Sequence, residues 1–380
     1  SREIEKNLRK GSPTYALKLL SSSKSRSLLD QTETDILKSR IISGYFYVGK
    51  SKEALALAKT VMSRSGEKAP NAAWIAGLIE WQNRNYDKAA ACFSIAATSP
   101  YSSGWAVAAS SFWAARSHMK AGNIRQISTW LNKAYEHPRT FYGLLAARAL
   151  GKDFHFDWKI PTFTKEYFDL LNASPQGKRA MALVAAGQNH LAEIELSHVD
   201  PSNNEDIYTA LLAYSDFAGL PSTGFRVGAF LSDAHTQDFY DMALYPIGPW
   251  TPTNGFEIDP ALIHAIMRQE SHFNPYAQNG YSGASGLMQL MPQTASYITK
   301  KDYNGKNTYK LLNPQTNLDI GQLYLQKLIA NPLVNGNIIK LLIAYNAGPG
   351  NLQKWTNNIN DLDDPLLYIE MIPAPETRAY

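Results

Sequence analysis

The clearest hydrophobic pattern of the chain lies in residues 259–292, where it predicts a helix followed by a loop. Asp259 followed by Pro260 is typical of a helix start, because Asp caps the first turn and Pro is tolerated there. Apolar side chains then recur at helical spacing: Leu262, Ile263, Ile266 and Met267. Glu270 lies four residues after Ile266, so this carboxylate continues the face that turns to the core.

A carboxylate in apolar surroundings keeps its proton longer, because desolvation disfavours the charged form. Glu270 is therefore a candidate proton donor near neutral pH. The competing interpretation is structural: the side chain bends back to water or pairs with the nearby Arg268. The helix alone favours the structural interpretation, because charged residues are common at helix ends.

The first part of the chain, to about residue 155, is rich in helix-forming residues and carries a loose repeat. Ala54 and Ala89 are 35 residues apart (89 minus 54), close to the tetratricopeptide period. Gly77 and Phe93 match small and aromatic positions of that repeat, where a small residue lets two helices approach closely. We predict an α-superhelix of tetratricopeptide-like helical pairs that bury their faces on their neighbours. An ordinary helical bundle is the alternative.

A connector follows the helical region, which ends near residue 234. It is marked by prolines and a glycine: Pro246, Pro249, Pro252 and Gly255. We place a domain boundary near Tyr245, which gives a helical scaffold domain over residues 1–244 and a second domain over residues 245–380. No segment shows the alternation expected of a sizeable sheet, so the fold is expected to be all-α.

A length of 380 residues and a hydrophobic content of 44% fit more than one globular domain. The net charge of +4 is small and scattered along the chain, which argues against nucleic-acid binding. Cys92 is the single cysteine, so no intrachain disulfide can form. The chain starts with Ser and has no apolar run of membrane-spanning length, and we expect residues at both ends to be missing from it.

Four motifs follow one another in the last third of the chain: RQESHFNP from Arg268, GASGLMQLMP from Gly283, AYNAGPG from Ala344 and YIEMIPAPETRAY from Tyr368. Together they resemble the family of soluble lytic transglycosylases, which cleave bacterial peptidoglycan. The N-terminal helices, with their FWAAR and TFYGLLA segments, are similar to the helical superdomain of that family. The resemblance implies a lysozyme-like α domain at the C-terminal end.

In that family the glutamate of the first motif is the single catalytic acid and base, and it corresponds to Glu270. The resemblance implies that Glu270 protonates the glycosidic oxygen between N-acetylmuramic acid and N-acetylglucosamine. As a carboxylate it would then take the proton of the muramyl C6 hydroxyl, which attacks the anomeric carbon and leaves a 1,6-anhydromuramyl end. The N-acetyl group of the substrate would stabilise the positive centre, as in substrate-assisted glycosidases.

The same resemblance implies a set of substrate-binding positions. Gln289, Met288 and Met291 correspond to residues that line the sugar cleft, where an amide binds sugar groups and thioethers give adaptable apolar contact. Tyr345 corresponds to a tyrosine that reaches toward the catalytic carboxylate. Asn346 corresponds to an asparagine that contacts sugar.

Glu370 corresponds to a second acidic position of the cleft, with a structural or substrate-binding role rather than that of proton donor. Relatives usually carry a serine three residues before the GASGLMQ block, where this chain has Gly280, and another where it has Met371. Asn279 or Ser282 could make the contact of the first missing serine. We therefore include Asn279 among the substrate-binding candidates.

Two other functions stay open. A goose-type-lysozyme-like hydrolase would need another carboxylate to position water across the cleft. Four carboxylates outside the motif could serve: Glu257, Asp259, Asp302 and Asp319. The third candidate is a non-catalytic scaffold that binds proteins through its repeats and holds glycan in its second domain.

We expect neither a cofactor nor a metal, because the eight His residues form no ligand cluster and KDYNGKNTYK from Lys301 lacks the acidic spacing of a calcium loop. The expected partners are peptidoglycan glycan strands, with protein partners on the helical scaffold. The chain is expected to be a monomer. The substrate implies an exported, periplasmic protein, whose signal segment is not present in this chain.

Overall fold

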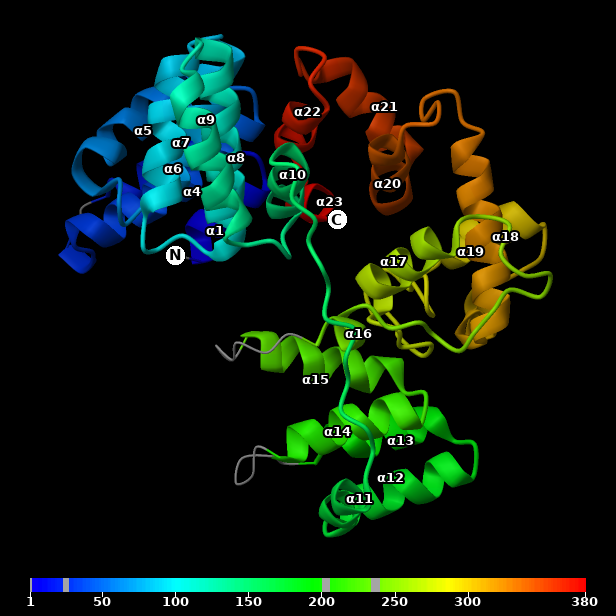
Figure 1. Ribbon diagram of the computed structural model, residues 1–380. Coiled ribbons are helices and arrows are strands. Elements are labelled where there is room, and N and C mark those ends of the chain that lie inside the picture. The colour runs from blue at the N-terminus through cyan, green and yellow to red at the C-terminus, as the bar shows by residue number, and fades with distance from the viewer. Residues whose placement is uncertain (1, 23–26, 200–205, 234–239) are drawn as a thin grey trace. The chain divides into compact units, whose positions relative to one another are not determined.

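The computed structural model describes residues 2–22, 27–199, 206–233 and 240–380, and it consists of helices joined by loops (Figure 1). These residues contain no strand and only two isolated β-bridges, from Ser285 to Gln278 and to Leu290. The all-α prediction is therefore confirmed. No helix in the same ranges combines the length and the apolar sequence needed to cross a bilayer.

Contacts divide the chain into two compact units. The first comprises Ser1–His155 and Gln353–Ala379, and the second comprises Phe156–Leu352 and Tyr380. This grouping differs from the sequence-based boundary near Tyr245 in two ways. Residues 156–244 group with the helices that follow them, and the segment Gln353–Ala379 packs on the N-terminal helices. The division into residues 1–244 and 245–380 stays a prediction about functional domains.

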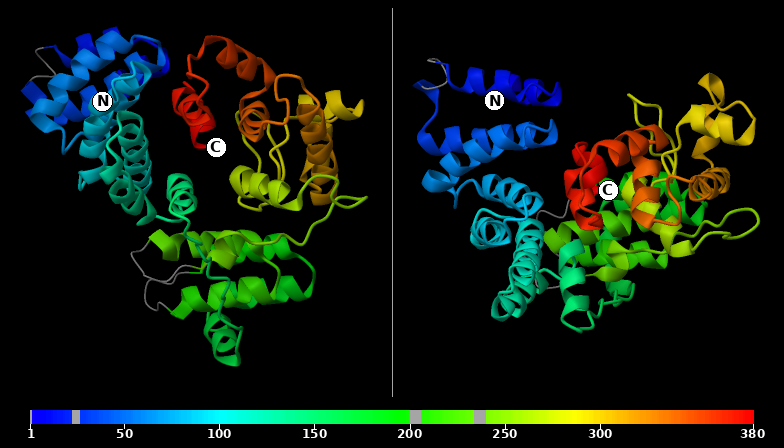
Figure 2. Two further views of the ribbon diagram at one scale, coloured as in Figure 1. Left: turned by 45° about the horizontal axis from the view of Figure 1, so that its top comes forward. Right: turned by 90° about the horizontal axis from the view of Figure 1, so that it is seen from above.

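The first unit is built mainly from N-terminal helices: α1 (Arg2–Arg9), α2 (Pro13–Leu20), α4 (Gln31–Tyr47), α5 (Ser51–Ser65), α6 (Pro70–Gln82), α7 (Tyr86–Thr98), α8 (Gly104–Ala121), α9 (Ile124–Tyr135) and α10 (Phe141–Ala149). Each helix from α4 to α9 packs on the next, as the turned views in Figure 2 show in blue and cyan. This nearest-neighbour stacking is the arrangement that helical repeats predict.

Gly77 shows why the repeat places a small residue on α6. A Cβ atom at this position would lie 2.5 Å from the ring of Phe93 on α7, so a larger residue would push the two helices apart. Phe93 is completely buried, with ring centroids 5.4 Å from Trp74 and 5.8 Å from Trp113. The expected close approach of the two helices is confirmed.

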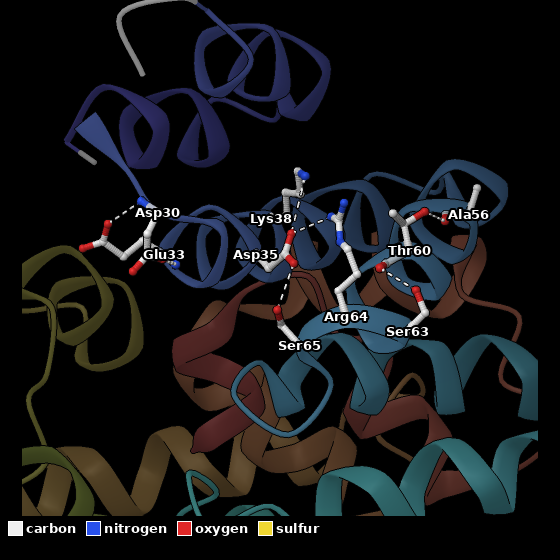
Figure 3. Close-up of polar contacts among 9 residues, drawn as sticks. All are labelled: Asp30, Glu33, Asp35, Lys38, Ala56, Thr60, Ser63, Arg64 and Ser65. Carbon is white, nitrogen blue, oxygen red and sulfur yellow. Dashed lines mark hydrogen bonds and ion pairs between the residues drawn. The ribbon is translucent and has the colours of Figure 1, made fainter. Parts of the chain in front are cut away.

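A buried carboxylate joins α4 to α5 (Figure 3). Asp35 is completely buried, and it accepts hydrogen bonds from the Arg64 guanidinium at 2.8 Å and the Ser65 hydroxyl at 3.0 Å. The Lys38 ammonium lies 3.5 Å away. A charge out of water is tolerated where such partners replace its hydration. The carboxylate therefore fixes the packing of these two helices.

The C-terminal segment of the first unit contains α22 (Pro365–Met371) and α23 (Pro375–Ala379), drawn in red in Figure 1. The Arg116 guanidinium of α8 bonds to Asp364 at 2.8 Å and lies over the Trp113 ring at 4.5 Å. Leu367 is completely buried in the core formed by the N-terminal helices. An ion pair and apolar burial therefore attach this segment to the first unit.

The second unit is also helical. Its elements are α11 (Lys165–Asn172), α12 (Pro175–Ala185), α13 (Asn189–Ser197), α14 (Asp206–Phe217), α15 (Pro221–Asp233), α16 (Asp241–Leu244), α17 (Pro260–Ser271), α18 (Pro292–Thr299), the 3-10 helix η1 (Gly305–Leu312), α19 (Pro314–Ile329) and α20 (Ile338–Ala347). Helix α21 (Pro349–Asn358) runs across the division between the units.

The connector between α16 and α17 contains no helix, as its prolines predict, and hydrogen bonds attach it to α19. The amide and hydroxyl of Thr253 donate to the Asp319 carboxylate at 2.7 and 2.6 Å. The Glu257 amide donates to the Gln322 side chain at 2.8 Å. Because the connector leads directly into α17, its attachment to α19 positions the start of that helix.

Asp35→Ala is expected to lower the free energy of unfolding by about 3 kcal/mol, because it leaves Arg64 and Ser65 without the carboxylate that they bind. Urea unfolding measures the change. The control is Glu5→Ala, which removes an exposed ion pair with Arg40 at 2.7 Å and should cost less than about 1 kcal/mol. Equal losses in the two variants would contradict the structural role of Asp35.

Candidate active site

Helix α17, labelled in Figure 1, carries the catalytic candidate of the sequence analysis. Glu270 lies near the C-terminal end of this helix. The helix begins at Pro260, as its sequence predicts, and the Asp259 side chain accepts a hydrogen bond from the Ala261 amide at 2.9 Å. Three of the four residues expected on the core face are buried, Ile263, Ile266 and Met267, and Leu262 is half-buried. Glu270 itself is half-buried.

The turn directly after Glu270 is strained. His272 and Phe273 have φ values of 50° and 63°, a left-handed region that costs a non-glycine residue about 1–2 kcal/mol. Phe273 is almost completely buried, and the Ser271 hydroxyl donates to the backbone oxygen of Leu287 at 2.8 Å. These contacts hold the end of α17, and with it Glu270, against the loop that follows.

Two tyrosines lie close to the Glu270 carboxylate. The Tyr380 hydroxyl donates a hydrogen bond to Glu270 Oε1 at 2.9 Å. Burial, followed by the charge of Glu270, raises the pKa of the Tyr380 hydroxyl and that of the Tyr345 hydroxyl above the usual value. Both hydroxyls therefore stay protonated at neutral pH, and Tyr380 remains a hydrogen-bond donor to the carboxylate.

Tyr345 also connects α20 to the loop before α18. Its hydroxyl donates to the backbone oxygen of Met288 at 2.8 Å, and its ring packs beside Tyr324 with centroids 5.4 Å apart. Asn346 follows on the same helix and is half-buried. The structure thus brings Tyr345 close to both Glu270 and the GASGLMQ loop.

Arg268, the partner considered for Glu270, makes other contacts. Its Nε donates to the backbone oxygen of Leu244 at 2.7 Å. Its guanidinium lies over the rings of Phe225 and Tyr245, at 5.1 and 4.8 Å from their centroids. Hydrogen bonding and cation–π attraction therefore give Arg268 a packing role between α17 and the chain before it.

The Gln289 side chain stabilises the loop between α17 and α18. Its backbone has a φ of 45°, and its side-chain nitrogen donates to the backbone oxygens of Ala277 and Gly286, each at 3.0 Å. Both N–H groups of the amide are therefore used inside the loop. The amide oxygen is a hydrogen-bond acceptor, so the predicted sugar contact of Gln289 would be made by that oxygen.

Asn317 of α19 fixes the same loop from the core side. It is completely buried, and its side-chain oxygen accepts from the Met288 amide at 2.8 Å. Its nitrogen donates to the backbone oxygens of Ser285 at 2.9 Å and Leu311 at 2.8 Å. A Cβ atom at Gly286, whose φ is +80°, would collide with the Asn317 amide, so the motif needs glycine there.

The structure corrects the prediction for Met288. Its side chain is completely buried, and its sulfur fills the space beside Gly321 of α19 that a Cβ atom would need. A thioether without access to solvent cannot contact a sugar, so Met288 contributes to the core and, through its backbone, to the loop. Met291 is 38% exposed and presents its thioether at the surface.

Glu370 belongs to the first compact unit, where it is buried. Its carboxylate accepts a hydrogen bond from the Tyr142 hydroxyl at 2.6 Å, and its backbone oxygen accepts one from Tyr47 at 3.3 Å. Burial raises the pKa of Glu370, while the Tyr142 bond and the charge of Arg378 oppose that rise. Of the two roles that the sequence left open, these contacts favour the structural one.

Asn279 lies on an exposed turn of the loop. Its side-chain oxygen accepts hydrogen bonds from the amides of Tyr281 and Ser282, each at 3.0 Å, and so closes the turn around Gly280. The Ser282 hydroxyl accepts from the Ala284 amide at 3.3 Å. Both candidates for the missing serine are thus used in forming the turn, and sugar binding by Asn279 stays a prediction.

The four carboxylates that could have served a hydrolase are all held by nearby donors. Their partners are as follows: Asp259 binds Ala261, Asp319 binds Thr253, Glu257 binds Gln326, and Asp302 binds Asn304 and Asn307. These bonds give each carboxylate a structural role. Within the described ranges, no three His, Cys, Asp or Glu side chains are grouped so that they could hold a metal ion.

Sequence reasoning missed two residues of the site, Tyr380 and Asn317. Tyr380 follows Glu270 by 110 residues, and helical periodicity cannot predict a contact between residues so far apart in the sequence. The one available signal for Tyr380 was its position at the end of the YIEMIPAPETRAY motif. From that motif the sequence analysis selected Glu370 as the site candidate. Asn317 was missed because an amide on a helix resembles an ordinary polar surface residue.

The comparison with known families points to the same part of the chain as the contacts around Glu270. The family model described as transglycosylase SLT domain matches residues 251–367, a range that includes Glu270, Gln289 and Tyr345. Residues 251–367 are thus similar to a transglycosylase SLT domain. The match begins close to the predicted boundary at Tyr245.

Curated relatives extend the similarity beyond the SLT domain. The chain is 30% identical over 275 residues to the soluble lytic murein transglycosylases of Salmonella typhimurium and Escherichia coli K12, which covers 71% of this chain and 41% of each relative. It is 39% identical over 146 residues to membrane-bound lytic murein transglycosylase C of Actinobacillus pleuropneumoniae, which covers 33% of this chain and 39% of the relative. The chain thus spans about two fifths of the length of these relatives. The predicted resemblance to soluble lytic transglycosylases is confirmed.

Two solved structures share the fold. They are an inactive variant of lytic transglycosylase Slt from Pseudomonas aeruginosa and the 70 kDa soluble lytic transglycosylase from Escherichia coli. Both match with a TM-score of 0.74, at 24% and 22% identity, over 99% of this chain and 60% and 59% of theirs. This likeness confirms the predicted fold, a helical superhelix with a lysozyme-like SLT domain.

Tyr380→Phe removes the hydroxyl that donates to Glu270 and keeps the ring. We expect the turnover of the predicted peptidoglycan cleavage to fall roughly tenfold to a hundredfold, with KM little changed, because a hydrogen bond to a charged group contributes about 1.5–3 kcal/mol. Steady-state kinetics on purified peptidoglycan measure both constants. Tyr297→Phe, at a tyrosine that is 68% exposed, is the control and should keep wild-type turnover. Equal turnover in the two variants would contradict a role for the Tyr380 hydroxyl.

Proposed function

We propose that the chain is a peptidoglycan lytic transglycosylase. It cleaves the β-1,4 bond between N-acetylmuramic acid and N-acetylglucosamine and leaves 1,6-anhydromuramyl ends. The observation that carries this proposal is the setting of Glu270, a half-buried carboxylate that receives the Tyr380 hydroxyl at 2.9 Å and lies near Tyr345. One carboxylate in such a setting suits a reaction in which a single group first gives a proton and then takes one.

In the first step, protonated Glu270 gives its proton to the glycosidic oxygen. The electron pair of the bond leaves with that oxygen, and the N-acetyl group of the muramyl sugar stabilises the positive anomeric carbon. Glu270 is then a carboxylate. The Tyr380 hydroxyl stabilises this state, because a donor to a carboxylate favours its charged form.

In the second step, the C6 hydroxyl of the same muramyl sugar attacks the anomeric carbon. Its oxygen forms the new bond, and its proton passes to Glu270, which returns to its initial state. No water is consumed, so the product is an anhydro sugar instead of a reducing end. A second carboxylate to activate water is not needed.

The bonds of the remaining carboxylates support the lyase over a goose-type-lysozyme-like hydrolase. A hydrolase needs a carboxylate that binds a water molecule across the cleft from the acid. Glu257, Asp259, Asp302 and Asp319 instead accept hydrogen bonds from neighbouring amides and hydroxyls. Each is thereby bound to the fold.

The names of the relatives support the same reaction. The curated proteins are lytic murein transglycosylases, and the inactive Slt variant carries a Glu-to-Gln substitution. That substitution keeps the shape of the side chain and removes its acid–base chemistry. It is the change expected to disable an enzyme that depends on one glutamate.

We propose that the substrate contacts come from four residues that the sequence predicted. The Gln289 amide oxygen binds a hydroxyl or acetamide group, and Met291 gives apolar contact to a sugar face. Asn346 and Asn279 supply further polar contacts. Glu370 supports the fold in this proposal.

We further propose that residues 245–380 form the catalytic domain, with residues 1–244 as its scaffold. The start of the SLT match at residue 251 supports this division. The chain acts as a monomer on glycan strands of the bacterial cell wall, in the periplasm, and its helical scaffold offers surfaces for protein partners. The murein-degrading function named for the relatives supports the location at the cell wall.

The proposed reaction is tested by digesting sacculi with the pure protein and identifying the new ends by mass spectrometry. The expected ends are 1,6-anhydromuramyl, lighter than reducing ends by one water. Reducing muramic ends would contradict the lyase and favour the hydrolase. Glycan binding without any new ends would favour a non-catalytic scaffold.

Glu270→Gln is expected to lower turnover about a thousandfold, because general acid–base catalysis by a positioned side chain contributes on this order. Release of soluble muropeptides from sacculi measures the rate. Glu257→Gln changes a carboxylate of the same unit whose partner is Gln326, and it should keep wild-type activity. Full activity of Glu270→Gln would contradict both the lyase and the hydrolase.

A further inference from the structure

A cavity of about 150 Å³ lies within the second compact unit. It forms where the α12–α13 turn, the α14–α15 turn, the connector and the loop after α17 meet. Its wall includes Glu193, His190, Trp250 and Tyr276. The proposed reaction uses none of these residues. A cavity of this size suits a small polar group on a short stem.

Glu193 of α13 is the acidic group of the cavity. Its carboxylate accepts hydrogen bonds from the Thr223 amide at 3.1 Å and from the Ser222 amide, both at the start of α15. Burial raises the pKa of Glu193 to about 7, although these bonds and the charge of Arg226 oppose the rise. Among the ion pairs of the described residues, none involves Glu193. The carboxylate is half-buried, and the charge of Arg226 acts on it without forming an ion pair.

The rest of the lining combines aromatic rings and prolines with two residues that carry side-chain amides, Gln188 and Asn189. The rings of His190 and Tyr276 stack with centroids 3.9 Å apart at an interplanar angle of 27°, and Trp250 contributes a further ring. Burial lowers the pKa of His190, so its ring is neutral near pH 7 and does not repel a cation. Four prolines, which have no N–H donor, also line the cavity: Pro221, Pro249, Pro275 and Pro314.

We propose that this cavity binds a primary ammonium group carried on a short apolar stem. The Glu193 carboxylate supplies the opposite charge and hydrogen-bond acceptors. The aromatic faces attract a cation through their π electrons, and the prolines pack against the stem. A neutral sugar could also contact these rings and the hydrogen-bond acceptor, but it carries no charge that could pair with the Glu193 carboxylate. The response to charge therefore separates the two occupants.

The binding is expected to depend on pH, because the ammonium ion needs Glu193 as a carboxylate. With a pKa of about 7, the charged fraction is roughly 90% at pH 8 and roughly 10% at pH 6, so affinity should fall roughly tenfold between them. The other titratable groups that face Glu193 are His190 on the same helix, Arg226 on α15 and Tyr276 on the loop after α17. Arg226 stays charged throughout, and His190 gains charge as pH falls, which weakens cation binding in the same direction.

The test is calorimetric titration of the full chain at pH 8 with n-butylammonium chloride, with 1-butanol at equal ionic strength as the neutral match. The ammonium ion is expected to bind at least tenfold more tightly than the alcohol. Glu193→Gln keeps an acceptor for the Thr223 amide and should lose that tenfold preference. Equal affinity for the two probes, an unchanged preference in Glu193→Gln, or no binding to the wild type would overturn the proposal.

Two further variants allow the proposal to be tested even if Glu193→Gln fails to fold. Glu195→Gln alters a carboxylate of the same helix that pairs with Arg179 at 2.8 Å, and it should bind n-butylammonium like the wild type. Tyr276→Leu removes an aromatic face from a side chain that is 45% exposed, and it should weaken binding about threefold. If Glu193→Gln does not fold, unchanged affinity in Tyr276→Leu together with equal affinity at pH 6 and pH 8 would overturn the proposal.

A second arm identifies where the ammonium group comes from. The probes are a muropeptide with a free side-chain amine and the same muropeptide with that amine acetylated. Tighter binding of the free amine, lost in Glu193→Gln, would assign the site to a cell-wall peptide. Equal binding of the two muropeptides, with n-butylammonium still bound, would assign it to small free amines. Binding is measured without turnover, so the result does not depend on the proposed cleavage reaction.

Discussion

The hydrogen bond from the Tyr380 hydroxyl to Glu270 is the interaction on which the proposed chemistry depends. It places a donor at 2.9 Å from a carboxylate at the end of α17. Burial raises the pKa of the tyrosine, so the donor persists at neutral pH. The carboxylate then has a partner for its charged state and partly buried surroundings that suit its neutral state. One side chain can therefore serve first as an acid and then as a base.

The surrounding helices hold the end of α17, which carries Glu270, in place through a single loop. Ser271 of α17 binds the loop at Leu287, while Tyr345 of α20 and Asn317 of α19 both bind it at Met288. Three non-glycine residues in this region have left-handed backbones, a strain that such bonds and core packing offset. The motif sequence therefore specifies a loop shape as much as a set of sugar contacts. Gln289 illustrates this, because its amide nitrogen is used to close the loop.

Local chemistry could be predicted from the sequence, and long-range contacts could not. Asp259 and Pro260 start α17 where the pattern places them, and Gly77 permits the close helix approach that its repeat position implies. Met288 was assigned wrongly to the sugar surface, because a loop has no periodicity from which burial against α19 could be inferred. The partner of Glu270 was missed for a related reason, since Tyr380 meets it only after folding. The Glu193 cavity is likewise assembled from segments far apart in the chain.

The central claim is that Glu270 directs the muramyl C6 hydroxyl, and not water, to the anomeric carbon. Its most direct test is cleavage of peptidoglycan in water enriched in heavy oxygen, followed by mass spectrometry of the new muramyl ends. The proposed mechanism predicts ends that contain no oxygen from the solvent. Heavy oxygen at the anomeric carbon would contradict it and identify a hydrolase.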